Sequence, residues 1–118
     1  VNVVSYALRD AMNASSGPWP KSDDEFAVAG LERAECDTIA CSRVVAAPAA
    51  LECEMTQIIP QRGEANFLVM GEVTGVHIDE RYLVDGRFDI TLYHPLARLG
   101  YRDYTAVTEL FSLKRPGE

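Results

Sequence analysis

The chain has 118 residues, of which 47% are hydrophobic and 25% charged, and its formal net charge is −7. This length and composition are typical of one folded domain and not of a disordered segment. The negative charge disfavours binding to nucleic acid or to an anionic membrane surface, because both are themselves negatively charged. No apolar stretch approaches the roughly 20 residues that a membrane-spanning helix needs. We therefore expect a single domain over residues 1–118 that binds neither nucleic acid nor membrane.

The first residues predict a strand that leads directly into a helix. Residues 1–4 are mostly valine, and Ser5 can cap a helix whose apolar side holds Leu8, Ala11 and Met12. A natural N-terminus seldom begins inside an element, and the chain does not start with Met. We therefore interpret the chain as a piece of a longer or processed protein.

The next elements are a helix, two long strands and a terminal strand. Acidic residues precede a short helix over residues 24–31, after a loop rich in Gly, Pro and Ser. Residues 49–59 alternate apolar and polar side chains, as a half-buried strand does. Residues 66–78 predict the next strand, and residues 67–70 form the first part of it. Residues 67–70 are apolar on both faces, and we expect both faces to be covered there. Residues 79–100 predict a long segment with little regular structure, and residues 105–116 a last strand.

Two glycines lie inside the strand predicted over residues 66–78. Gly71 and Gly75 fall on one face under strict alternation, together with His77. A glycine within a strand indicates sharp curvature or close approach by another group. Strands joined by turns, with a few short helices, predict a β-rich α+β domain, and the curvature favours a barrel over a flat sheet.

The three cysteines, Cys36, Cys41 and Cys53, are an odd number, which argues against a closed disulfide framework. Cys36 and Cys41 lack the C-x₂-C spacing of a zinc knuckle, and only two histidines are present, so we expect no metal site. Free thiols are typical of a reducing compartment, which indicates a cytoplasmic protein.

His77 is the main candidate for chemistry, because imidazole titrates near neutral pH and Asp79 and Glu80 follow it closely. The alternative is a solvated histidine at a strand end with no role. Glu52 and Glu54 share a strand face and could form a carboxylate pair, but an exposed outer face is the preferred interpretation. No nucleophile elbow, dinucleotide fingerprint or Walker loop is present.

The segment PLARLGYRDY, residues 95–104, places Arg98, Tyr101, Arg102 and Tyr104 around a glycine. Arginine and tyrosine bind planar, anionic or aromatic ligands through paired hydrogen bonds and stacking. The alternative is a loop held together by aromatic packing, and the composition does not decide between the two.

Five stretches together resemble the C-terminal two-thirds of the flavin reductase-like proteins, whose fold is an FMN-binding split β-barrel. They are, in chain order, VNVVSYALRDAMNASS, DEFAVAGLE, APAALECEM, GEVTGVHIDERYLVDGRFD and PLARLGYRDY. No single stretch is diagnostic, but their order and spacing are fairly specific. The resemblance covers nearly the whole chain.

The resemblance implies a homodimer of Greek-key split barrels that bind FMN without a covalent bond near the subunit interface. It implies hydride transfer from NADH or NADPH to flavin, with reduced flavin passing to a partner monooxygenase. His77 matches the histidine that lies near the nicotinamide and isoalloxazine rings in relatives. The loop match gives Arg98 and Tyr101 flavin contacts, and Asn2 is a further candidate cofactor-binding residue.

The chain departs from the family in one respect, because the segment that grips the FMN phosphate precedes the part that matches. The barrel is then expected to lack its first strands, and this polypeptide alone is expected to hold FMN poorly. A non-catalytic flavin-binding or dimerisation module on the same fold is the alternative function. Assembly through an exposed strand edge is a third possibility.

Overall fold

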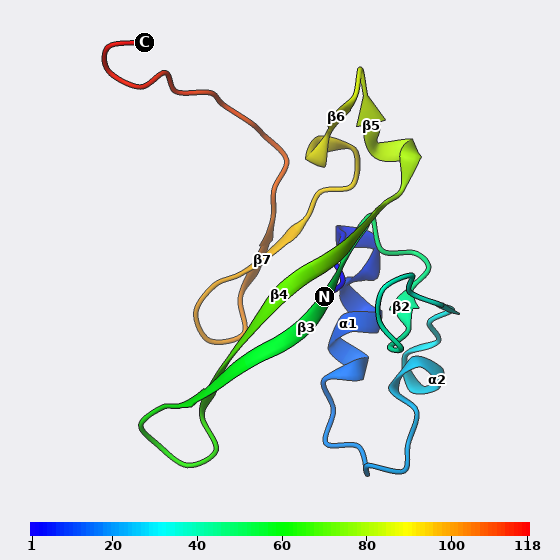
Figure 1. Ribbon diagram of the computed structural model, residues 1–118. Helices are drawn as coiled ribbons and strands as arrows, with labels where there is room; N and C mark the ends of the chain where they lie inside the picture. Colours follow the sequence, from blue (N-terminus) through cyan, green and yellow to red (C-terminus); the bar gives the residue numbers. More distant parts are fainter.

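The computed structural model describes all of residues 1–118, as short helices around antiparallel strand pairs (Figure 1). The elements in chain order are the 3₁₀ turn η1 (Tyr6–Leu8), α1 (Arg9–Ser15), α2 (Glu25–Ala29), β1 (Arg33–Ala34), β2 (Arg43–Val44), β3 (Ala49–Pro60), β4 (Phe67–Ile78), η2 (Glu80–Tyr82), β5 (Leu83–Val84), β6 (Arg87–Phe88), η3 (Ile90–Leu92), β7 (Leu96–Arg98) and β8 (Tyr104–Ala106). The pairs are β1 with β2, β3 with β4, β5 with β6 and β7 with β8.

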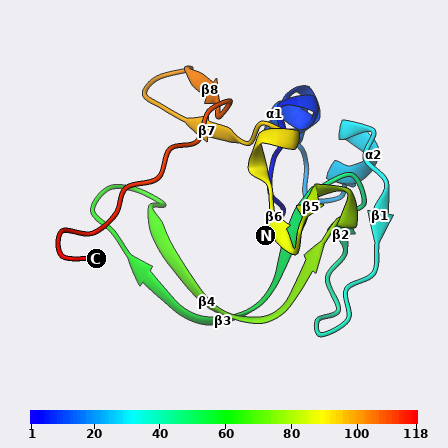
Figure 2. The same ribbon diagram turned by 90° about the horizontal axis from the view of Figure 1, so that it is seen from above.

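The hairpin of β3 and β4 is the largest element, and it confirms both long strands predicted from the sequence. Its register shifts between Glu52 and Cys53 and again between Met55 and Gln57. Such bulges bend a strand pair and increase its twist. The hairpin accordingly forms a wide arc in Figure 2.

The first five residues connect two hairpins through isolated bridges, so the strand predicted there appears as extended chain without a strand of its own. On one side, Asn2 bridges to Ala50 of β3. On the other side, Ser5 bridges to Pro95, and the Leu96 N–H donates to the Val4 carbonyl at 3.0 Å. The resulting strand order is β4, β3, residues 1–5, β7, β8.

Both predicted helices form, but the cap predicted at Ser5 does not. The Asp24 carboxylate accepts from the Phe26 N–H at 3.0 Å, and Gly30 ends α2 in the left-handed region with φ 65°. The Ser5 side chain makes no capping bond, and a 3₁₀ turn precedes α1. Ser5 is instead buried within the bridge to Pro95. No helix combines the length and hydrophobicity needed to span a membrane.

The C-terminal third differs from the sequence-based expectation in two ways. Residues 79–100 are more regular than predicted, since they contain a small hairpin, two 3₁₀ turns and β7. The terminal strand is much shorter than predicted, because pairing stops after the Val107 N–H donates to the Pro95 carbonyl. His94, which precedes Pro95, has φ 51° and leaves the extended conformation. Residues 107–118 therefore form no strand, and Phe111 in this segment is 85% exposed.

The chain buries little of its apolar surface. Only 7 of 118 residues are buried, and they lie mainly where the start of β3 meets the first residues and Tyr93. The radius of gyration is 16.6 Å, whereas a compact domain of this length has roughly 13 to 14 Å. The expectation that residues 67–70 are covered on both faces is wrong for this chain, because these side chains are 47–61% exposed. No other element packs on that end of the hairpin (Figures 1 and 2).

Candidate functional site

His77 and Asn2 lie on one face of the sheet. His77 of β4 pairs with Ala50 of β3, and Ala50 also bridges to Asn2. Directly paired residues of antiparallel strands project to the same face. The structure therefore brings two predicted site residues into one row, separated only by Ala50, whose side chain is almost completely buried.

His77 is half-buried and lines an open groove of about 680 Å³ formed by residues 76–81. The Asp79 carboxylate in this groove is bound by Arg81, whose Nη2 donates at 2.6 Å. Hydrogen bonds from the Arg81 side chain and backbone lower the pKa of Asp79, and the nearby His77 adds to this effect. Asp79 therefore stays ionised but is engaged by Arg81, and it makes no hydrogen bond to His77.

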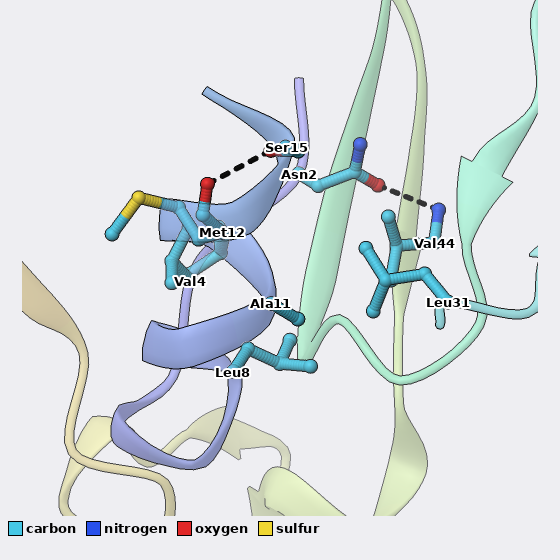
Figure 3. Close-up of a pocket in the computed structure, with 9 residues that line it drawn as sticks. Asn2, Val4, Leu8, Ala11, Met12, Ser15, Leu31 and Val44 are labelled. Carbon is cyan, nitrogen blue, oxygen red and sulfur yellow. Dashed lines mark hydrogen bonds between the residues drawn. The ribbon is translucent and has the colours of Figure 1, made fainter. Parts of the chain in front are cut away.

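Asn2 has a structural contact in addition to its predicted role. Its Oδ1 accepts from the Val44 N–H at 2.9 Å, and this hydrogen bond connects β2 to residues 1–5 (Figure 3). Asn2 also borders a cavity of about 150 Å³. The other walls of this cavity are mostly apolar side chains of α1 and of residues 3–8. Its Nδ2 makes no hydrogen bond and is free to donate.

The loop residues predicted to contact flavin lie on the hairpin of β7 and β8. The Arg98 guanidinium is 5.9 Å from the centroid of the Tyr104 ring, and Tyr101 is 95% exposed with φ 58°. The pocket beside this hairpin shares no lining residue with the His77 groove. Within this chain the two surfaces are separate, and the flavin contacts of Arg98 and Tyr101 stay predictions.

The sequence-based interpretation of Glu52 is wrong, because Glu52 is only 3% exposed while Glu54 is exposed. Its carboxylate accepts from the Asp37 N–H at 3.0 Å, the Thr38 N–H at 2.7 Å and the Thr38 hydroxyl at 2.6 Å. The Thr38 hydroxyl, then the backbone N–H groups, lower the pKa of Glu52 to about 2. Glu52 is two residues from Ala50 on β3, so it lies on the same face as His77.

Gly75 explains how the loop over residues 36–38 reaches this face. Glu52 pairs with Gly75 across the hairpin, and a Cβ at Gly75 would lie 2.8 Å from Glu52 Oε2. The Thr38 hydroxyl also hydrogen-bonds that of Thr74 at 2.7 Å. The prediction of close approach at Gly75 is confirmed, because the Glu52 carboxylate and Thr38 lie against it. A glycine within this strand was the signal in the sequence for this contact. The bulge beside Glu52 also places Gly71 and Gly75 on opposite faces, which corrects the strict alternation.

The cysteines are free thiols, and two of them lie in or beside the same loop. Burial, followed by the charge of the adjacent Glu52, raises the pKa of Cys36, so this thiol stays protonated near neutral pH. No group of three or more His, Cys, Asp or Glu side chains is arranged to hold a metal ion.

Comparison with known proteins identifies the relatives. An uncharacterized protein of Deinococcus radiodurans is 33% identical over 119 residues, which cover 98% of this chain and 52% of that protein. Nitrilotriacetate monooxygenase component B from Bacillus cereus superimposes with a TM-score of 0.84 at 25% identity, over 96% of this chain and 58% of that one. A protein from Shewanella frigidimarina, described as a flavin reductase with a split barrel domain, has a TM-score of 0.78 at 20% identity, over 97% and 58% of the two chains. The chain thus spans about half to three-fifths of the length of these relatives.

The fold predicted from the sequence, a β-rich split barrel, is confirmed by these neighbours. The family model for the flavin reductase like domain matches residues 1–96, which include Asn2 and His77. The chain belongs to the flavin reductase like domain family.

Proposed function

We propose that the chain is part of an FMN-dependent NAD(P)H:flavin oxidoreductase. The observation that carries this proposal is the family match over residues 1–96, which includes the face shared by Asn2 and His77. When bound, FMN would supply the redox chemistry by accepting a hydride from NADH or NADPH. The protein would position the two rings and set the charge around them.

The four predicted site residues offer groups that suit a planar ring system, and His77 is the one among them that lines the groove. The half-buried His77 imidazole makes no side-chain hydrogen bond, so it is available to a ligand. Asn2 offers its free Nδ2, and Arg98 and Tyr101 offer a guanidinium with no carboxylate partner and an exposed phenol. We assign His77 the role of ordering the nicotinamide or donating a hydrogen bond to reduced flavin. Asn2, Arg98 and Tyr101 are assigned contacts with FMN.

The FMN phosphate requires a set of converging donors that this chain does not supply beside His77. The groove there contains one arginine, and that arginine is engaged by Asp79. We therefore assign the phosphate contacts to parts of the longer protein, in keeping with relatives that are nearly twice as long.

The test is oxidation of NADH and NADPH by the full-length protein with added FMN. His77→Asn should lower kcat/KM by about tenfold or more, which corresponds to loss of about 1.4 kcal/mol of transition-state stabilisation. His94→Asn is the matched control, because His94 is exposed and lies on a turn away from the groove. Equal activity of the two variants, or no oxidation by the unmodified protein, would overturn the proposal.

A homodimer is the second part of the proposal, and the exposed residues 67–70 support it. Four adjacent apolar side chains on a strand that no other element covers are suited to an interface.

A partner monooxygenase is consistent with the similarity to a monooxygenase component B. The free thiols agree with a cytoplasmic location. A non-catalytic flavin-binding or dimerisation module remains the alternative, and a dimer that binds flavin without oxidising NADH or NADPH would support it.

A further inference from the structure

A second pocket lies between α1 and the hairpin of β7 and β8, and its volume is about 410 Å³. Figure 2 shows this hairpin beside α1, across the molecule from the middle of the β3–β4 arc. The pocket shares no lining residue with the His77 groove. Its size is within the range of sites for small organic ligands.

The charged groups of the pocket leave one donor free. Arg9 is already engaged, because its Nη1 donates to the Tyr6 carbonyl at 3.0 Å and its Nη2 lies 3.5 Å from Asp10. Arg102 has no carboxylate within 4 Å and makes no side-chain hydrogen bond. A free guanidinium presents a planar pair of N–H donors that matches one carboxylate group.

The other walls suit a flat, largely apolar body. Tyr6 and Tyr104 line the pocket, together with Leu96 of β7 and Ala106 of β8. An arginine lies near each tyrosine ring: the Arg9 guanidinium is 4.2 Å from the Tyr6 ring centroid, and the Arg98 guanidinium is 5.9 Å from the Tyr104 ring centroid. Tyr6 is 50% exposed and Tyr104 42% exposed, so both rings present aromatic surface to a flat ligand.

We propose that this pocket binds a small aromatic carboxylate. The carboxylate would pair with Arg102, and the ring would stack against Tyr104. A phosphate dianion is a poorer match, because only one guanidinium is free and Asp10 adds negative charge to the lining. The pocket lies on the same hairpin as Arg98 and Tyr101, the two predicted FMN contacts, but neither of them lines it, and it shares no lining residue with the His77 groove.

The experiment is calorimetric titration of flavin-free protein with benzoate, cyclohexanecarboxylate, benzyl alcohol and inorganic phosphate. Benzoate is expected to bind saturably and at least several-fold more tightly than the other three compounds. Arg102→Gln should weaken benzoate binding about tenfold, and Tyr104→Leu should weaken it more than it weakens cyclohexanecarboxylate binding.

Arg115→Gln is the control, because Arg115 is an exposed arginine outside the pocket and its replacement should leave benzoate binding unchanged. Far-UV circular dichroism of each variant establishes that it is folded, and Arg102 lies on an exposed turn where its replacement leaves the packing intact. The proposal is overturned by absence of saturable benzoate binding. It is equally overturned by phosphate binding as tightly as benzoate, or by equal effects of the Arg102 and Arg115 substitutions.

Discussion

Thr38 holds the Glu52 carboxylate by two hydrogen bonds, from its backbone N–H at 2.7 Å and from its hydroxyl at 2.6 Å. The same hydroxyl contacts Thr74, three residues before His77. Glu52 therefore fixes the loop over residues 36–38 against the face of the sheet that presents His77. Loss of this contact should be measurable in the stability of the protein.

Glu52→Gln should lower the melting temperature by several degrees. The ionised carboxylate accepts hydrogen bonds from three donors through its two oxygens. The glutamine amide has one neutral oxygen and an NH₂ group that cannot accept, so at least one of these partly buried donors loses its acceptor. Thermal unfolding followed by circular dichroism measures the change. Glu54→Gln is the matched control on the same strand, and it should leave the melting temperature unchanged because Glu54 is exposed. Equal shifts in the two variants would contradict the role assigned to Glu52.

The pH dependence of stability should show the Glu52 contact directly. The folded pKa of Glu52 is about 2 and its reference value is 4.5, so the ionised form is favoured in the folded state. The stabilisation is fully present above pH 4.5 and is lost as the pH falls from there towards 2. Urea unfolding at pH values from about 2.5 to about 6 measures the free energy of unfolding. This free energy should fall more steeply with decreasing pH in the unmodified protein than in Glu52→Gln. Asp79 and Asp89 also have lowered pKa values, so only the difference between the two proteins isolates Glu52. Parallel pH profiles would be inconsistent with this prediction.

Gly75→Ala should destabilise the protein by about 1 to 3 kcal/mol, the usual cost of forcing an extra methyl group into a packed site. The added Cβ would lie 2.8 Å from Glu52 Oε2 and 3.1 Å from Thr38 Oγ1, so the Glu52 carboxylate and its bond to Thr38 have to shift. Gly100→Ala is the control, because a Cβ added there would have nothing within 4 Å, and its effect should be within about 0.5 kcal/mol. Chemical denaturation measures both, and the idea fails if Gly75→Ala is as stable as Gly100→Ala.

Val69→Lys should weaken the proposed dimer. Val69 is 61% exposed at the centre of residues 67–70, and a charge placed there would be desolvated in an apolar interface. Light scattering coupled to gel filtration should show a shift from dimer to monomer at micromolar concentration. Glu64→Lys, in the turn that precedes β4, is the control and should remain dimeric. A monomeric unmodified protein, or an unchanged dimer in Val69→Lys, would rule out this surface as the interface.

Local chemistry in the sequence was sufficient for the main elements. Alternation defined the strand that became β3, and acidic residues indicated the start of the short helix that became α2. The resemblance of five ordered stretches gave the family and the fold, which the family match and the split-barrel neighbours confirm. The predicted roles of His77, Asn2, Arg98 and Tyr101 are untested, because residue type and order do not establish what a side chain binds.

The sequence by itself determined where the chain extends, turns and coils, because these preferences depend on neighbouring residues. Only the tertiary structure decided that Glu52 is buried and that residues 67–70 are exposed. Alternation states which side chains share a face, but it does not state which face a distant loop covers. That loop reaches Glu52 from 14 residues away in the sequence. A bulge then shifts the register beside it, so burial at this site depends on contacts that no local pattern contains.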